Sequence, residues 1–362
     1  MEISLYKYRF PFSKPFTTAR DTFSHREGFI IELKDQGVQA VGEAAPLPGF
    51  SKESMDEVQN YLKNNWDTVT GLIADYTTKN SYQAIAPGET PTSVAFALDT
   101  LIVDCWSSRE HIPLRRLLFN ESRSKIKINA TLPINKLEKS LEKAELLWKK
   151  GYRTLKVKVG GSPEQEYTLI KQLRTRFPKL KIRIDANQSW DFGEAVNTLQ
   201  KFTPLNIEYC EEPLTNPSPD AFVKLREQTD IPIALDESLH QNKGILEWKK
   251  RKIADIVIIK PMVFGGMKKN FETIRLAVNH DYIIIFTTSL ESGIGRLMTA
   301  TLAAGLSSPQ FAHGLNTGSH LAMDVWDDSM YIKEGQWTLP STEGLGLAYE
   351  PEKLVSVKKL DL

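Results

Sequence analysis

Charged side chains end five successive β-rich runs in the middle of this sequence, each where an apolar stretch stops. The runs finish in Lys156-Val157-Lys158, Asp185-Ala186-Asn187, Glu211-Glu212-Pro213, Asp236-Glu237-Ser238 and Lys260-Pro261. If neighbouring runs are parallel strands, these ends share one rim, and carboxylates from three adjacent strands converge there. Oxygen ligands without His or Cys suit Mg²⁺, whereas three buried anions alone would repel one another. The pattern predicts a magnesium site flanked by lysines.

Lysines stand on both sides of the predicted metal site. Lys156 and Lys158 are two positions apart on one run, so we expect both to point into the same interior, and Lys260 comes from the opposite side. A buried lysine beside a second lysine and a divalent cation loses its proton more readily and can act as a general base. These residues indicate removal of a proton next to a carboxylate, because a cation and an ammonium group stabilise the negative charge that forms.

Eight β-rich runs, most of them separated by amphipathic helical stretches, follow one another from about residue 125. They cover residues 126–132, 154–159, 181–187, 207–213, 232–238, 256–261, 282–291 and 311–315. The alternation predicts parallel strands with right-handed crossovers, and eight such strands close a modified (β/α)8 TIM barrel in the α/β class, with its site at the carboxyl ends. A doubly wound open sheet is the structural alternative.

The first 120 residues follow a different pattern. The sequence predicts antiparallel strands at 1–10 and 29–34, polar loops at 13–26 and 42–51, and helices at 52–66 and 92–107. After about residue 323 the β/α rhythm is lost. We therefore predict an N-terminal α+β capping domain over 1–120, a barrel over 121–323, and a C-terminal segment over 324–362 that packs back on the cap.

The composition is that of an ordinary globular protein. Of 362 residues, 41% are hydrophobic and 25% charged, and the formal net charge is +1, which gives no electrostatic footprint for nucleic acid or for an anionic membrane. Cys105 and Cys210 are predicted to be buried thiols. No apolar run approaches the roughly 20 residues of a membrane span. We expect a cytoplasmic enzyme for a small-molecule carboxylate, with no nucleic-acid or membrane partner; a homo-oligomer remains open.

Five segments resemble the muconate-lactonizing subgroup of the enolase superfamily. They are KVK at 156–158, IDAN at 184–187, EEP at 211–213, LDES at 235–238 and IIKP at 258–261. The spacings between Asp185, Glu211, Asp236 and Lys260 also agree, at 26, 25 and 24 positions. The resemblance covers essentially the whole chain and implies a cap domain, a modified barrel and bound Mg²⁺.

Carried over by position, the resemblance implies a role for each of these residues. The implied Mg²⁺ ligands are Asp185, Glu211 and Asp236, the implied base is Lys158, and Lys260 is a second base or electrostatic stabiliser on the other face. Asn187 and Lys156 are implied as supporting residues near the substrate or metal. Glu212 is the rival of Glu211, but the spacing and strand alternation favour Glu211.

Three further segments resemble the o-succinylbenzoate synthases: KPFTTARDTFSHREGF at 14–29, SLESGIGR at 289–296 and HGLNTG at 313–318. Those enzymes dehydrate 2-succinyl-6-hydroxy-2,4-cyclohexadiene-1-carboxylate in menaquinone biosynthesis, so the resemblance implies a lyase. N-succinylamino acid racemases are the alternative, because two lysines on opposite faces also serve racemisation. Dipeptide epimerases carry an Asp-x-Asp motif near the eighth strand, where this chain has Asn316-Thr317-Gly318.

Substrate contacts are expected from two regions. One is the first loop, through Arg20, with Thr18 and Arg26 as further candidates; the other is the end of the seventh run, through Ser289, Glu291 and Ser292. Backbone N–H groups of a helix that opens at Gly293 are expected to hold a succinyl carboxylate. Pro48, Gly49 and Phe50 are predicted to form a second lid wall. His313 and His320 are interpreted as hydrogen-bonded structural residues.

Overall fold

The computed structural model describes residues 1–17, 22–78, 90–240, 248, 250–306 and 308–361. Its largest sheet has seven parallel strands in the order β11-β10-β9-β8-β7-β6-β5. The strands are β5 (Ala130–Leu132), β6 (Thr154–Lys158), β7 (Lys181–Asp185), β8 (Ile207–Glu211), β9 (Ile233–Leu235), β10 (Ile256–Ile259) and β11 (Ile283–Phe286). Each strand pairs with its successor in the chain, as in a barrel. A doubly wound sheet would instead reverse its order at the centre.

The predicted eighth run, 311–315, forms no regular strand but still closes the ring. Parallel bridges join Gly314 to Thr287 on one side and His313 to Ile128 on the other. The predicted first run also differs from expectation, because it divides into β4 (Lys125–Lys127) and β5. Strand β4 belongs to a small antiparallel sheet with β13 (Gln336–Thr338) and β12 (Ile332–Lys333). The barrel fold is confirmed, with its eighth strand reduced to two bridges.

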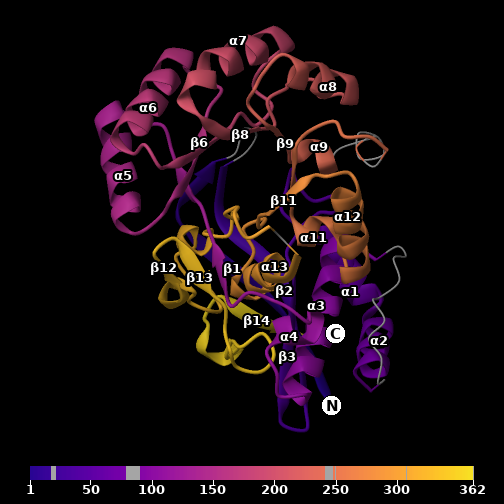
Figure 1. The fold of residues 1–362 in the computed structure, drawn as a ribbon. Helices are drawn as coiled ribbons and strands as arrows, with labels where there is room; N and C mark the ends of the chain where they lie inside the picture. The colour runs from indigo at the N-terminus through magenta and orange to yellow at the C-terminus, as the bar shows by residue number, and fades with distance from the viewer. Residues whose placement is uncertain (18–21, 79–89, 241–247, 249, 307, 362) are drawn as a thin grey trace.

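Helices connect the barrel strands and cover their outer face (Figure 1). They are α5 (Leu137–Lys149), α6 (Pro163–Arg176), α7 (Phe192–Phe202), α8 (Pro219–Glu227), α9 (Glu237–His240), α11 (Pro261–Phe264), α12 (Met267–Asn279) and α13 (Gly293–Leu306). Local sequence sets their starts: Asp191 and Glu194 form a capping box on α7, and Pro163 opens α6. Between 316 and 361 the described residues form three short 3-10 helices, η2 (Gly318–His320), η3 (Ser329–Tyr331) and η4 (Pro351–Lys353), and no α-helix.

Alternation along the strands places polar residues above an apolar floor. The barrel interior holds a separate hydrophobic cluster of Tyr209, Ala234, Ile256, Ile258 and Ile285. Side chains of a strand return to the same face every second residue. The residues two positions after Tyr209, Ala234, Ile258 and Ile285 are Glu211, Asp236, Lys260 and Thr287. Each of these therefore stands at the carboxyl-terminal rim of the barrel, over the apolar cluster.

An antiparallel sheet of order β14-β1-β2-β3 forms the centre of the second part, which we call the cap. Its strands are β1 (Glu2–Thr17), β2 (Thr22–Asp35), β3 (Val38–Ala44) and β14 (Val357–Leu360). Strand β14 brings the C-terminal segment alongside β1. The predicted polar loop at 13–26 is wrong over most of its length, because β1 and β2 stay paired as far as Thr17 and Thr22. Their backbone pairing outweighs the polar composition.

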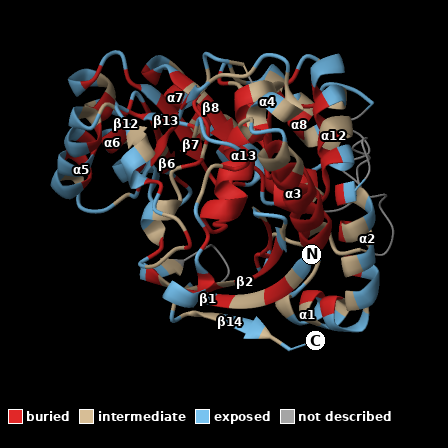
Figure 2. Cartoon of the chain, turned by 90° about the horizontal axis from the view of Figure 1, so that it is seen from below, coloured by how far each residue is buried: buried red, intermediate tan, exposed pale blue. Residues whose placement is uncertain are grey.

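Helix α3 (Thr92–Arg109) joins the cap to the barrel. It follows α1 (Met55–Asn64) and α2 (Trp66–Thr78), and it is buried on nearly every face (Figure 2). A helix that is buried all round must have neighbours on all sides. Strand β3 packs against one side of α3 and helix α11 against another, and the Asp99 carboxylate accepts a hydrogen bond from Met267 N at 2.6 Å. No helix of the described residues is long and apolar enough to cross a membrane.

The contact between β3 and α3 leaves no room for a side chain at Gly42. A Cβ there would lie 1.9 Å from the Ala97 carbonyl oxygen, so we expect Gly42→Ala to lower the free energy of unfolding by about 2–3 kcal/mol, as overpacked cores do. Gly71→Ala in α2 is the matched control, since nothing lies within 4 Å of its added Cβ; it should be neutral or stabilise by up to about 1 kcal/mol. Chemical denaturation compares the two, and equal stabilities would contradict this packing.

Candidate active site

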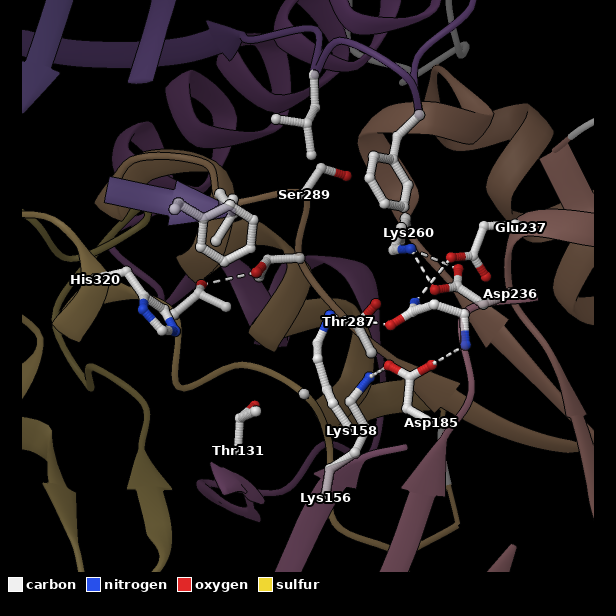
Figure 3. Close-up of a pocket in the computed structure, with 18 of the residues that line it drawn as sticks. Thr131, Lys156, Lys158, Asp185, Asp236, Glu237, Lys260, Thr287, Ser289 and His320 are labelled. Atoms are coloured by element: carbon white, nitrogen blue, oxygen red, sulfur yellow. Dashed lines mark hydrogen bonds and ion pairs between the residues drawn. The ribbon is translucent and has the colours of Figure 1, made fainter. Parts of the chain in front are cut away.

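A pocket opens at the carboxyl-terminal rim of the barrel and is closed on one side by the cap. Its empty volume is about 1300 Å³, including the open mouth. The barrel supplies residues from the ends of most of its strands, while the cap supplies Phe16, near the end of β1, and residues 47–50. Figure 3 shows lysine and carboxylate side chains gathered on one side of this space. The pocket is large enough for a small metabolite.

Lys156, within β6, forms a double ion pair beneath the pocket. Its Nζ lies 2.9 Å from Asp185 Oδ2 and 3.0 Å from Glu211 Oε1. Burial lowers the pKa of Lys156, but the Asp185 and Glu211 carboxylates outweigh this effect and hold the pKa well above its ordinary value. Lys156 therefore remains an ammonium group and serves as a counter-ion to two strand-end carboxylates.

Lys260 forms the second ion pair of the site. Its Nζ lies 2.5 Å from both carboxylate oxygens of Asp236, and the Phe50 ring of the cap lies over the ammonium group, 4.6 Å away at its centroid. Burial lowers the pKa of Lys260, but Asp236 more than compensates and the pKa is raised. The cation–π contact with Phe50 links the cap directly to a charged group of the barrel.

Lys158, at the end of β6, has a different partner. Its Nζ donates to Asn187 Oδ1 at 3.1 Å, and Asn187 Nδ2 donates to Glu237 Oε1 at 3.0 Å. This chain of hydrogen bonds fixes the direction of the Lys158 side chain without a carboxylate next to it. All three lysines line the pocket. Lys158 differs from the other two because it forms no ion pair with the described residues.

Repulsion among the carboxylates is visible in their acidities. Burial, followed by repulsion from Asp185, raises the pKa of Glu211 to about 8. Burial and the neighbouring Asp236 likewise raise the pKa of Glu237. At Asp236 itself burial raises the pKa, but the Lys260 ammonium prevails and the pKa is lowered. The lysines therefore compensate Asp236 but leave the pKa of Glu211 and of Glu237 raised.

The donor set fits a hard divalent cation. Asp185, Glu211 and Asp236 come from three adjacent strand ends, and Glu211 Oε2 is buried without a hydrogen-bond partner, which is costly for a carboxylate oxygen. Within the described part of the chain, no three His, Cys, Asp or Glu side chains are already arranged to hold an ion. The lysines contact these carboxylates instead, so binding of a cation requires their side chains to move.

Neither Glu211 nor its sequence rival Glu212 lines the pocket, but Glu211 pairs with the pocket residue Lys156, whereas Glu212 is bonded to the turn after β9. Its Oε1 accepts hydrogen bonds from the backbone N–H groups of Asp236 and Ser238 at 2.7 and 2.8 Å, and its Oε2 accepts from Ser238 Oγ at 2.8 Å. Glu212 thereby fixes the turn that carries Asp236 and Glu237. Glu237 was not selected from the sequence, although it lines the pocket and its Oε2 has no partner. A second carboxylate directly after a strand was the available signal.

Of the three predicted substrate contacts after β11, the structure places one in the pocket. Ser289 lines it, and its buried Oγ has no hydrogen-bond partner. Glu291 lies outside and accepts from Ser289 N at 2.8 Å, while Ser292 donates its N–H and its hydroxyl to Glu43 of the cap at 2.8 and 2.7 Å. The expectation that Glu291 and Ser292 contact substrate is therefore corrected: Glu291 is bonded within the segment after β11, and Ser292 links the barrel to the cap.

The start of α13 is not open to a ligand either. Gly293 N donates to Asp324 Oδ1 and Gly295 N donates to Glu43 Oε2, both at 2.8 Å. Carboxylates of the protein thus already take the place predicted for a succinyl carboxylate at this helix N-terminus.

Of the two candidate arginines of the first loop, the structure describes Arg26. Arg20 and Thr18 lie outside the described residues. Arg26 is buried and donates to backbone carbonyls: Pro46 O at 2.9 Å and Ala45 O in the cap, Leu290 O at 3.2 Å and Ser289 O at 3.4 Å in the barrel. Arg26 therefore links residues 45–46 of the cap, which follow β3, to residues 289–290 of the barrel, which follow β11.

The two histidines near the eighth strand, His313 and His320, differ in their surroundings. His313 is fully buried, and its Nδ1 accepts a hydrogen bond from Phe286 N at 3.1 Å, as expected of a structural residue. His320 lines the pocket, a position that its interpretation as a structural residue did not include. Thr131 and Phe16 line it as well and were not selected, because a threonine inside a strand and an aromatic residue near a loop give no chemical signal in sequence.

Comparison with known proteins agrees with this arrangement. The family model described as "Enolase C-terminal domain-like" matches residues 139–353, and the model "MenC, N-terminal domain" matches residues 1–102. A solved structure of muconate lactonizing enzyme from Pseudomonas fluorescens superposes with a TM-score of 0.81 at 19% identity, over 97% of both chains.

Relatives with three different activities have similar levels of identity. The D-Ala-D/L-Ala epimerase of Cytophaga hutchinsonii is 27% identical over 99% of this chain and 98% of its own. The o-succinylbenzoate synthase of Vibrio cholerae is 28% identical over 87% and 88%. The N-succinyl-L-Arg/Lys racemase of Bacillus cereus is 25% identical over 83% and 81%. With more than half of its length matched by the enolase C-terminal family model, this chain belongs to the enolase superfamily.

Proposed function

We propose that the protein is a Mg²⁺-dependent o-succinylbenzoate synthase, a lyase that dehydrates 2-succinyl-6-hydroxy-2,4-cyclohexadiene-1-carboxylate to 2-succinylbenzoate in menaquinone biosynthesis. The observation that carries the proposal is the match of residues 1–102 to the MenC N-terminal domain. That stretch supplies the cap side of the pocket, through Phe16 and residues 47–50. The Vibrio cholerae synthase, similar over most of both chains, supports the same reaction.

The base in this reaction is Lys158. It takes the proton next to the substrate carboxylate, and its hydrogen bond to Asn187 aims the amine into the pocket. Bound Mg²⁺, held by Asp185, Glu211 and Asp236, would supply positive charge beside that carboxylate. If the proton and the hydroxyl leave from one face, the protonated Lys158 can return the proton to the departing hydroxyl, which leaves as water. One residue then serves first as base and then as acid.

Lys260 needs no proton transfer in this dehydration. It follows β10, whereas Lys158 ends β6. Those strands are four positions apart in a ring of eight, so the two amines face the substrate from opposite sides. The Lys260 ammonium group, which the Phe50 ring covers, would stabilise the negative charge that develops when the proton is removed.

N-succinylamino acid racemase is the second candidate. Racemisation needs a proton donor or acceptor on each face of the substrate, which the opposite placement of Lys158 and Lys260 allows, and the Bacillus cereus racemase is similar to this chain. A dipeptide epimerase is less favoured. The residues of the eighth-strand segment that line the pocket, Gly314, Asn316, Thr317 and His320, include no carboxylate to hold a substrate ammonium group.

The direct test is turnover by the purified protein with Mg²⁺. We expect dehydration of the cyclohexadiene substrate to exceed racemisation of N-succinylamino acids in kcat/KM. A faster racemisation would make the second candidate the main activity, and turnover of dipeptides alone would exclude both.

The two lysines are expected to separate the two reactions. Lys158→Ala should abolish both, because no other group takes its place as base. Lys260→Arg keeps the charge but cannot release a proton near neutral pH, so it should leave measurable dehydration and eliminate racemisation. Both assays, with α-proton exchange into deuterated water, measure this split. The exposed Lys201→Arg, whose amine pairs with Glu164, is the control. Full racemase activity in Lys260→Arg contradicts the two-face assignment.

Metal binding is expected to depend on Glu211. Glu211→Gln removes a charge and should weaken Mg²⁺ binding by at least about tenfold, a loss of about 1.4 kcal/mol, with a matching loss of activity; Asp185→Asn and Asp236→Asn should act alike. Titration calorimetry with Mg²⁺ measures this directly. Glu166→Gln is the matched control, since Glu166 is equally buried but accepts from Gly160 N and Gly161 N. Unchanged Mg²⁺ affinity in all three variants would show that the metal binds elsewhere.

A further inference from the structure

We propose that His320 is a substrate-binding residue that donates a hydrogen bond to the carboxylate at the end of the substrate's acyl arm. The inference rests on the proposed function in one respect only, which is that the substrate carries a succinyl arm as well as the carboxylate at the reacting centre. It holds for the dehydration substrate and for N-succinylamino acids alike.

The position of His320 points to a ligand. Its ring lines the pocket, and it meets the Phe16 ring edge-on, with centroids 5.7 Å apart and an interplanar angle of 73°. Figure 3 shows His320 on the side of the pocket opposite to Asp236 and Glu237. Neither ring nitrogen has a hydrogen-bond partner among the described residues. An imidazole that is half-buried in a pocket with both nitrogens free is placed to bind something else.

The backbone around His320 is fixed from both sides. His320 N donates to Thr317 O at 3.0 Å within η2, and the Thr317 hydroxyl meets that of Thr288, after β11, at 2.7 Å. Immediately after His320, Leu321 bridges to Phe12 of β1. The histidine therefore sits where the barrel is joined to the cap, and its ring is held at the pocket wall by both.

The contact beneath Gly318 adds a further restraint. A Cβ at Gly318 would lie 2.6 Å from Arg296 Nη2 and 2.9 Å from Asp328 Oδ1, so η2 packs directly on a buried ion pair. Arg296 is itself held by Asp324 and Asp328 at 2.6 and 2.8 Å. A rigid support of this kind is what a residue that orients a ligand requires.

The surroundings of His320 favour an anion over a cation. Burial, followed by the positive charges of Lys158 and Lys143, lowers the pKa of His320, so the ring is neutral near pH 7 and offers one N–H donor. The positive charge of Lys143, which acts on this ring, disfavours a ligand ammonium group and favours a carboxylate. Thr288 and Thr317 also line the pocket, and because their hydroxyls share one hydrogen bond at 2.7 Å, one further O–H donor remains for a ligand. An acyl arm that ends in a carboxylate matches this wall, whereas an arm that ends in a methyl group leaves the donors unpaired.

The wall that carries His320 is separate from the carboxylate cluster. The carboxylates of Asp185, Asp236 and Glu237 and the Lys260 ammonium lie on the other side of the pocket (Figure 3). A substrate with its reacting carboxylate there extends its second arm toward His320. We therefore assign His320 to recognition of the arm and not to proton transfer.

Paired ligands that differ only at the end of the arm test the assignment. Calorimetry with the Mg²⁺-loaded protein compares 2-succinylbenzoate with 2-butanoylbenzoate, and N-succinylglycine with N-butanoylglycine. We expect the wild type to prefer each succinyl ligand. His320→Phe keeps the ring against Phe16 but removes the donor, and should cut succinyl affinity at least about tenfold while changing butanoyl affinity less than about twofold. His320→Gln restores a donor and should recover most of the preference.

His280→Phe, at the end of α12 and away from the pocket lining, is the control and should bind as the wild type does. An equal loss for succinyl and butanoyl ligands in His320→Phe, or no preference in the wild type, overturns the assignment. The proposed function is judged separately by turnover of the wild type. Failure of dehydration together with a His320-dependent preference for N-succinylglycine would reject the synthase and keep the assignment. Dehydration by the wild type without that preference would support the synthase and reject the assignment of His320.

Discussion

Neutralisation of buried negative charge is the constraint on which this site depends. Asp185, Glu211 and Asp236 end three adjacent parallel strands, so the topology forces their carboxylates together. Their burial and mutual repulsion are strong enough to raise the pKa of Glu211 to about 8. Lys156 and Lys260 neutralise part of this negative charge through ion pairs with Asp185 and Asp236. Because such a cluster is unstable without positive charge, the barrel rim holds lysine side chains and offers a donor set that fits a divalent cation.

The junction between cap and barrel is built from the same kind of interaction. Buried Arg26 donates to carbonyls of both parts, and buried Glu43 accepts from the start of α13. Backbone groups compensate Arg26, and backbone N–H groups together with the hydroxyls of Tyr8 and Ser292 compensate Glu43. The cap loop that carries Phe50 is therefore tied to the strand end that carries Ser289, so the pocket is a product of both parts.

The barrel and the strand-end cluster could be predicted from sequence because each follows from a local rule. Period-two alternation decides which side chains enter the barrel, and parallel topology brings strand ends to one rim. The partners of polar residues follow no such rule. Arg26 sits in a polar stretch and is buried only because the carbonyls of Ala45, Pro46, Ser289 and Leu290, distant in sequence, surround it. Glu291 and Ser292 were misplaced for the same reason.

The division of the pocket into a charged side and a hydroxyl-lined side explains why overall similarity does not select one reaction. Removing a proton beside a carboxylate is a step that dehydration, racemisation and epimerisation of such substrates all need, and the charged side suits each of them. Relatives named for all three reactions are 25–28% identical to this chain. We infer that discrimination comes from the other side, where Thr288, Thr317 and His320 line the pocket. A neutral donor wall there would select acyl arms by their oxygens, because an arm that offers no acceptor leaves the His320 donor unpaired.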